Sequence, residues 1–462
     1  MASRSELFAH GGRHLSTPGT LFARARALAL RVVTDREARI VAVFSLLSIV
    51  GGFFGNRLLT QVAQPEALGK YYLYANLAQW LSMPAAAGFV YINHHWPIAR
   101  EHGDTRRFSR AIAFAVALQA GIALAGAVTM HFSGTAGMEG AGPATGVGLL
   151  ALGTGTYQLL CTLPGAERWR GWSGALSLLG GNARPFAQAF GILLLGTAAS
   201  AGLLGAAVTL QLVAAGMAAT LYVWIFRTTL SADPPRLTSQ LSFRAFLTYS
   251  VPGFFGVLIP QIASSIERWG LARSSDTAAT ALFVQAMGMS VAVTGAISGI
   301  VVNYYYPFAT NAAARDTADP LGAAAPILRQ FYGVLVTALA SVTVLIALFV
   351  KPITWIAFGA RFASVARLLP WTIVGASLFA LGAALTAALF IARDAMWPNL
   401  ARIISQLAYV AALLLLPRGS DPAGTFAREY AGAQALYTLL IAGAIWRQLV
   451  ARRLNGNGAV AS

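Results

Sequence analysis

The chain of 462 residues is 57% hydrophobic and 11% charged, and it contains a single cysteine. Its mean hydropathy of +0.63 exceeds what the polar surface of an ordinary soluble globule allows, so that class is excluded. The net charge of +17 would suit nucleic acid, but the arginines are scattered between apolar segments instead of forming one basic face with interleaved aromatic residues. We therefore expect a membrane protein and no nucleic-acid partner.

Long apolar segments recur along the whole chain. A helix that crosses a bilayer needs about 20 apolar residues, and twelve segments meet that length. They lie near residues 40–62, 71–95, 109–131, 145–163, 173–196, 201–226, 243–266, 279–306, 327–350, 366–391, 397–416 and 427–446. The pattern predicts an all-α integral membrane protein with about twelve transmembrane helices.

The N-terminal residues are basic. They carry several arginines but no uninterrupted apolar core followed by a small-residue cleavage site, so we expect no cleaved signal peptide. Residues 20–38 could lie as an amphipathic helix on anionic membrane lipids, or could act only as a basic tail that sets orientation. Most of the 33 Lys and Arg residues fall in segments that share one side if the N-terminus is cytoplasmic, which predicts that both termini are cytoplasmic.

One short motif occurs twice. The segment INHHWPIA at residues 92–99 returns as VNYYYPFA at residues 302–309. A weaker echo, GFFG, occurs at residues 52–55 and again at 253–256. Duplicated helical halves are typical of transporters, where the substrate path lies at the interface of the repeats.

A polar segment around Pro234 and Pro235 separates the first six predicted spans from the last six. No connection is long enough to form a soluble domain, and a carrier of two lobes needs no second copy to form its path, so we expect a monomer. The predicted parts are a basic cytoplasmic N-terminal segment (1–38), an N-lobe (39–227), a cytoplasmic linker (228–242), a C-lobe (243–448) and a cytoplasmic C-terminal tail (449–462).

Few charged side chains fall within the spans, where one costs about 2.5–3.5 kcal/mol on insertion scales. Arg184 precedes Pro185 in the fifth span, where it could line a polar cavity or bond to carbonyls freed by the proline. Arg57 lies in the outer part of the first span, where it either snorkels to the interface or faces a cavity. Glu267 and Arg268 end the predicted seventh span, as a solvated pair or as part of a cavity.

Neutral polar residues in the spans could form hydrogen bonds between helices or line a wet path suited to sugar hydroxyl groups. From these we select Gln61, Gln261 and Asn303 as further candidate site residues. The chain has no H-E-x-x-H, P-loop or G-x-S-x-G motif and no large outer loop with histidines and carboxylates. We therefore expect no catalytic residue, no metal and no cofactor.

Two segments resemble a known family. QPEALGKYY at residues 64–72 resembles the G-P-x-x-F/Y-G-x-Y motif after the first span of polysaccharide-biosynthesis (O-antigen-type) flippases in the MOP (multidrug, oligosaccharidyl-lipid, polysaccharide) superfamily. Residues 351–352 and 358–370 resemble that family's loop before the tenth span, usually G-x-x-Y/F-x-x-A. The chain departs from the first motif by Gln64, where glycine is usual.

The resemblance implies a MATE-like carrier with two six-helix lobes around a central cavity. Such a carrier moves an undecaprenyl-pyrophosphate-linked oligosaccharide between leaflets of the bacterial inner membrane, from the cytoplasmic to the periplasmic one, for O-antigen, capsule or exopolysaccharide synthesis. Its functional partners would be glycosyltransferases and a polysaccharide polymerase. Cavity arginines in this family are thought to face the pyrophosphate, and by location the candidates are Arg57, Arg184 and Arg268.

Other classes remain as alternatives. A cation-coupled multidrug exporter of the MATE type should hold a carboxylate deep in a lobe, whereas the predicted spans are nearly free of acids. A membrane glycosyltransferase or O-antigen ligase should have a large outer loop. A twelve-span facilitator should carry G-x-x-x-D-R-x-G-R-R after its second span, and residues 100–110 lack that pattern.

Overall fold

The structure is a computed structural model that describes residues 36–101, 105–133, 141–161, 163, 170–195, 200–230, 243–315, 319–392, 394, 396–415 and 420–458. Within these ranges the chain forms fourteen α-helices, one π-helical turn and one 3-10 turn, and no β-strand. The predicted all-α class is therefore confirmed.

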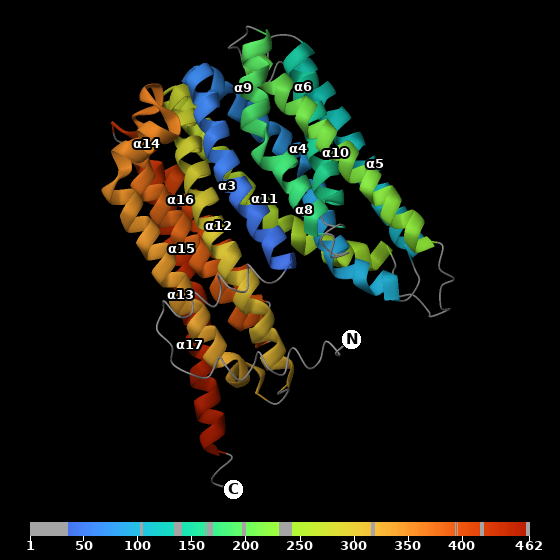
Figure 1. Cartoon of the computed structure of the whole chain (residues 1–462), viewed down its shortest axis with the longest axis vertical. Coiled ribbons are helices and arrows are strands. Elements are labelled where there is room, and N and C mark those ends of the chain that lie inside the picture. The colour runs from blue at the N-terminus through green and yellow to red at the C-terminus, as the bar shows by residue number, and fades with distance from the viewer. Residues whose placement is uncertain are drawn as a thin grey trace.

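The N-terminal half forms one group of helices, coloured blue to green in Figure 1. Its elements are α3 (Arg36–Val62), α4 (Pro65–Glu101), α5 (Thr105–Ser133), α6 (Ala141–Leu160), α8 (Arg170–Ser177), the π-helical turn η3 (Leu178–Asn182), α9 (Arg184–Leu195) and α10 (Ser200–Leu230). We call this group the N-terminal bundle.

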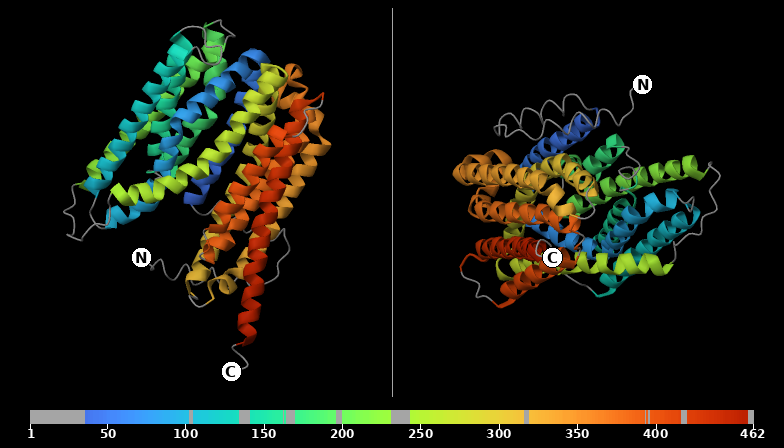
Figure 2. Two further views of the ribbon diagram at one scale, coloured as in Figure 1. Left: turned by 180° about the vertical axis from the view of Figure 1, so that it is seen from behind. Right: turned by 90° about the horizontal axis from the view of Figure 1, so that it is seen from below.

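The C-terminal half forms the second group, which lies beside the first in both figures (Figures 1 and 2). Its elements are α11 (Phe243–Ser274), α12 (Thr277–Arg315), α13 (Pro320–Leu348), α14 (Val350–Phe358), the 3-10 turn η4 (Ala360–Phe362), α15 (Val365–Ile391), α16 (Met396–Leu415) and α17 (Pro422–Gly458). We call it the C-terminal bundle. Helix α4 packs along both α11 and α12, and so forms most of the seam between the bundles.

The described residues of the twelve predicted spans are almost all helical, and within the described ranges six helices are long and apolar enough to cross a membrane by length and composition. These six lie at Phe108–Ser133, Ser200–Arg227, Thr277–Ala313, Pro320–Leu348, Val365–Ile391 and Met396–Leu415. Large apolar side chains remain exposed on the outside of the bundles, as at Leu124 and Leu194, which suits contact with lipid. The chain is a multi-pass membrane protein.

The fifth predicted span differs from the prediction because it is not one continuous helix. It is divided into α8, η3 and α9, and Arg184 is the first residue of α9. Pro185 follows directly, and proline disfavours helical geometry at the preceding residue while fitting well in a first turn. The glycines at 180 and 181 in the π-helical turn add backbone freedom at the same point. The local sequence thus places a charged residue at a helix break.

Two helices run further than predicted. The seventh span was predicted to end at residue 266, but α11 continues to Ser274, so Glu267 and Arg268 lie inside a helix. Helix α17 continues to Gly458, beyond the predicted lobe end at residue 448. The predicted N-terminal segment falls almost wholly outside the described residues, as does most of the linker, and the boundaries of the five parts stay a prediction.

The two copies of the repeated motif occupy corresponding helices. Residues 92–99 belong to α4 and residues 302–309 to α12, the second long helix of each bundle. The side chains of 92–99 lie outside the described residues. In the second copy Tyr305 is buried and its ring lies 6.0 Å from that of Phe331, so this aromatic residue packs in the helical core instead of belonging to an interfacial belt.

The helices approach each other closely at small residues, as expected where lipid gives no hydrophobic drive for association. One very close approach across the seam is at Gly69, where a Cβ atom would collide with the main-chain carbonyl of Thr277 at the start of α12. Gly69 is the only glycine of residues 64–72 and occupies the second glycine position of the family motif. The glycine in that motif therefore allows α4 and α12 to touch.

We predict that Gly69→Ala lowers the midpoint of thermal unfolding of the detergent-purified protein. The added methyl group has no room beside Thr277, and overpacking of this kind costs about 1–3 kcal/mol. The matched control is Gly121→Ala on the exposed face of α5, where a Cβ atom meets nothing within 4 Å. An equal change for the two variants would contradict the close packing of α4 on α12.

Candidate functional site

A cavity of about 380 Å³ lies where the two bundles meet, and we call it the polar cavity. Its walls come from α3, α4, α6 and α9 of the N-terminal bundle and from α11 and α12 of the C-terminal bundle. The polar side chains that line it are Asn56, Tyr71, Tyr72, Gln79, Thr154, Gln158, Arg184, Gln188 and Arg268. Two guanidinium groups and no carboxylate occur among the described lining residues, so its electrostatic potential favours anions.

Arg184 reaches the polar cavity from the helix break before α9. Its Nη2 donates a hydrogen bond of 2.7 Å to Oε1 of Gln211 on α10, which fixes one side of the guanidinium group. Its Nε is buried and has no hydrogen-bond partner in the structure, and the same is true of Oε1 of Gln158. An unsatisfied buried polar group costs about 1–3 kcal/mol, so both atoms are suited to meet a polar ligand or water.

Arg268 enters the polar cavity from the opposite bundle. It is half-buried on α11, and both it and Arg184 are close enough to interact electrostatically with the hydroxyl group of Tyr72. That hydroxyl also accepts a hydrogen bond of 2.9 Å from Nε2 of Gln285 on α12. The two arginines thus line one cavity together with Tyr72, in an arrangement that suits a ligand with several anionic oxygen atoms.

A second cavity of about 380 Å³ lies within the C-terminal bundle, and we call it the C-terminal cavity. It shares Arg268 and Val284 with the polar cavity. Glu267 is only 7% exposed there and accepts a hydrogen bond of 2.5 Å from the hydroxyl of Tyr409 on α16. The adjacent pair is therefore not a solvated pair at a helix end, because α11 continues past it and buries the carboxylate.

Two of the remaining candidates lie away from the polar cavity. Nη1 of Arg57 donates a hydrogen bond of 2.9 Å to the carbonyl of Trp355 on α14, and the guanidinium lies 5.8 Å from the centre of that ring. The carbonyl of Gln61 accepts a hydrogen bond of 3.2 Å from Nη1 of Arg361 on η4. Both residues therefore join α3 to the second family-like segment, and neither is among the residues that line the polar cavity.

Gly359 between α14 and η4 makes this contact feasible. Its φ angle is +81°, a region that only glycine adopts readily, and a Cβ atom there would collide with the guanidinium group of Arg57. Gly359 in the second family-like segment is therefore required by the backbone conformation and by the close contact with Arg57.

The last two candidates predicted from the sequence are Gln261 and Asn303. Gln261 is 4% exposed, and its Nε2 donates a hydrogen bond of 3.3 Å to the carbonyl of Asn76. Asn76 Oδ1 also accepts from Ser265 and Trp269, so Gln261 belongs to a hydrogen-bonded seam between α4 and α11. The side chain of Asn303 lies outside the described residues.

Several residues of the polar cavity were not selected from the sequence. Tyr72 lies in the first family-like motif, and Leu150, Thr154 and Gln158 follow each other at every fourth position of α6. That spacing places them on one helix face and was a usable signal. Asn56 gave no comparable signal, and neither did Arg402 of the C-terminal cavity, since the position of each depends on how distant helices pack.

Comparison with solved structures shows a fold similar to that of known transporters. No protein-family model matches the sequence, and no curated protein matches it significantly. The structure is similar to that of the lipid II flippase MurJ in an inward closed conformation, with a TM-score of 0.64, 11% identity, and coverage of 88% of this chain and 87% of that one. The chain has the all-helical membrane fold of the MOP superfamily.

Two further neighbours represent other members of that superfamily. An inward-facing multidrug resistance MATE family transporter gives a TM-score of 0.65 at 12% identity, covering 90% of this chain and 98% of that one. A MOP superfamily transporter from Pyrococcus furiosus, described as having a binding pocket of reverse polarity, gives a TM-score of 0.53 at 14% identity, covering 90% of this chain and 97% of that one. These neighbours are transporters and flippases, not enzymes.

We predict that the polar cavity reacts faster with an anionic than with a cationic thiol reagent. The chain has one cysteine, so Cys161→Ala gives a background in which Thr154→Cys is the only thiol. We expect the rate ratio of the sulfonatoethyl to the trimethylammonioethyl methanethiosulfonate to exceed the intrinsic ratio at least about tenfold, because one charge about 10 Å away at an effective dielectric constant of about 20 contributes about 1.7 kcal/mol, favourable for the anion and unfavourable for the cation. The measurement is the rate of labelling by intact-protein mass spectrometry.

Two controls complete this test. Replacing Arg184 with Gln in the same background should reduce the preference, and a cysteine at the exposed position Ser274 should show only the intrinsic ratio of the two reagents. A preference for the cationic reagent at position 154 would show that the cavity is not an anion site.

Proposed function

We propose that the protein is a flippase that moves a lipid-linked oligosaccharide, carried on undecaprenyl pyrophosphate, from the cytoplasmic to the periplasmic leaflet of a bacterial inner membrane. The observation that carries the proposal is the meeting of Arg184 and Arg268 in one cavity between the two bundles, with no carboxylate among its described lining residues. A pyrophosphate group presents several oxygen atoms to which planar guanidinium groups bind bidentately.

The rest of the polar cavity suits the sugar part of such a substrate. Amide and hydroxyl groups line it beside the arginines, at Asn56, Gln79, Thr154, Gln158 and Gln188. Neutral donors and acceptors match sugar hydroxyl groups without imposing a charge. Gln158 Oε1 accepts no hydrogen bond in the structure and so can accept one from a sugar hydroxyl group. The similarity in fold to a lipid II flippase adds support, although at 11% identity it concerns the fold alone.

Transport in this proposal requires no covalent chemistry. Binding at the seam places the substrate between two bundles, and their relative rotation alternates access to the two sides. The contacts that such a movement would break include hydrogen bonds from Arg57 to the carbonyl of Trp355 and from Gln261 to the carbonyl of Asn76. The product would pass to a polysaccharide polymerase, after glycosyltransferases have built the substrate.

A second candidate function is cation-coupled drug export. It is favoured by Glu267, a buried carboxylate in the C-terminal cavity of the kind that such an exporter uses to bind a cation, and by the similarity to MATE transporters. Arg268 directly beside it opposes a cationic substrate in the same place. We therefore rank the exporter below the flippase.

We predict that a strain lacking the protein loses a surface polysaccharide and accumulates lipid-linked repeat units on the cytoplasmic side. Wild-type protein should restore display, Arg184→Ala and Arg268→Ala should not, and Arg184→Lys should restore it in part because lysine keeps the charge but loses the planar fork. The measurements are glycan display by gel and lectin labelling, with membrane levels of each variant determined by immunoblot.

The matched control is Arg273→Ala. Arg273 lies on the same helix as Arg268 but is exposed and absent from the cavity lining, so this variant should behave as wild type. Intact surface glycans in the deletion strain, together with raised sensitivity to cationic drugs, would reject the flippase and support the exporter.

A further inference from the structure

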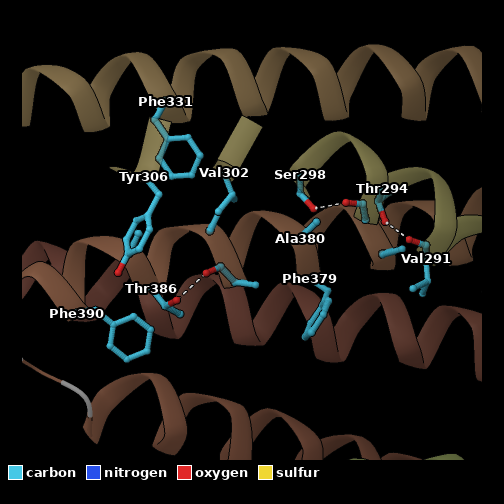
Figure 3. Close-up of a pocket in the computed structure, with 15 residues that line it drawn as sticks. Val291, Thr294, Ser298, Val302, Tyr306, Phe331, Phe379, Ala380, Thr386 and Phe390 are labelled. Atoms are coloured by element: carbon cyan, nitrogen blue, oxygen red, sulfur yellow. Dashed lines mark hydrogen bonds between the residues drawn. The ribbon is translucent and has the colours of Figure 1, made fainter. Parts of the chain in front are cut away.

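A third cavity of about 440 Å³ lies along α12 and α15 in the C-terminal bundle, and we call it the apolar groove. Figure 3 shows the rings of Tyr306, Phe331, Phe379 and Phe390 along it. The remaining lining is formed by Val291, Val302 and a series of alanines on α15, with Gly295 on α12. The groove therefore presents hydrocarbon surface over most of its length.

The serine and threonine hydroxyl groups in the apolar groove donate hydrogen bonds within their own helices. Thr294 donates to the carbonyl of Ser290 at 2.9 Å, Ser298 to that of Gly295 at 3.2 Å, and Thr386 to that of Ala383 at 2.6 Å. A ligand in the groove finds few polar partners, in contrast to the polar cavity with its unpaired Arg184 Nε and Gln158 Oε1.

The three cavities form a series of neighbours that share lining residues. The apolar groove shares Val291 and Phe379 with the C-terminal cavity, which in turn shares Arg268 and Val284 with the polar cavity. The C-terminal cavity in the middle mixes Glu267, Arg268 and Arg402 with apolar groups, whereas no charged side chain lines the apolar groove. A molecule that fills all three has a charged head and a hydrocarbon tail.

One face of α12 runs along the whole series. The lining residues of α12 lie at 283, 284, 287, 288, 291, 294, 295, 298, 302 and 306, a spacing that keeps them on one helix face. From Val284 to Tyr306 the helix rises about 33 Å at 1.5 Å per residue, which is comparable to the thickness of the hydrocarbon core, about 30 Å. The path is long enough for several isoprene units of a polyprenyl chain and longer than a short drug-like molecule requires.

We propose that the apolar groove binds the polyprenyl chain of the same lipid whose phosphate head lies at Arg184 and Arg268. The inference rests on the proposed function and adds that the tail is held by the protein along α12 during transport, instead of staying wholly in the surrounding bilayer. Chain length then becomes a determinant of affinity, as well as the head group.

Two glycines provide a way to block the groove without disturbing the fold. Gly288 borders the C-terminal cavity and Gly295 the apolar groove, and a Cβ atom at either position meets nothing within 4 Å. Replacing a helical glycine also tends to favour the helix. Gly295→Phe should therefore fill the groove in a folded protein, and Gly333→Phe, on an exposed part of α13 with equally open space, is its matched control.

The test measures binding of pyrophosphates of different chain length to the full-length protein in detergent, by native mass spectrometry. The probes are inorganic pyrophosphate and geranyl, geranylgeranyl and undecaprenyl pyrophosphate. We expect the affinity of wild-type protein to rise with chain length. We expect Gly295→Phe to lower the affinity for undecaprenyl pyrophosphate at least about tenfold, equivalent to about 1.4 kcal/mol, and to leave the affinity for geranyl pyrophosphate unchanged. Gly333→Phe should bind all four probes as wild type does.

The outcomes separate the two proposals. If wild-type protein binds the short and long compounds equally, or if Gly295→Phe has no effect on the long one, the tail site is wrong while the head-group site stands. Displacement of undecaprenyl pyrophosphate from the groove by an equal concentration of phosphatidylglycerol would assign the groove to bulk lipid and also overturn the inference. If none of the probes binds to wild-type protein, the proposed function itself fails.

Discussion

A charged group inside a layer of apolar helices must find polar partners from the protein, because the surrounding lipid offers none. The centre of this molecule is arranged around that requirement. Arg184 lies at the break between η3 and α9, where Pro185 ends regular helical geometry, and its guanidinium reaches Gln211 on the neighbouring α10. The polar groups of α3, α4 and α6 gather at the same place, and Arg268 joins them from the other bundle. The polar cavity is the result of solvating these two cations.

The helices were predictable from the sequence because a segment that crosses lipid must consist mainly of apolar residues. Segments of about 20 apolar residues predicted the helices, six of which are long and apolar enough to cross a membrane, and the repeated motif falls on α4 and α12, the second long helix of each bundle. Arg184 lines the polar cavity and was predicted far from either end of a span, where a charge has few other places to go. Arg268 also lines it, although it was predicted at the end of the seventh span.

The remaining features depend on contacts between distant segments, which a single sequence does not reveal. Hydropathy placed the end of the seventh span at residue 266, because two charged residues, Glu267 and Arg268, are typical of a membrane surface. In the structure α11 continues past them, since Tyr409 on α16 donates a hydrogen bond to the buried carboxylate of Glu267. Arg57 resembled a cavity residue by its depth, but the short α14 offers it the carbonyl and ring of Trp355. The apolar groove is invisible in composition, since its valines and alanines are indistinguishable from those that face lipid.

Arg268 borders the polar cavity and the C-terminal cavity at once, and this has a thermodynamic consequence. A single guanidinium cannot take up the best position for ligands on both sides, so occupation of one cavity alters the free energy of binding in the other. Linkage requires the effect to be reciprocal: a cation that neutralises Glu267 changes the affinity for an anion at Arg184 by the same factor by which that anion changes the affinity for the cation. If a cation binds beside Glu267 and an anion beside Arg184, the two compartments form one coupled binding system through Arg268.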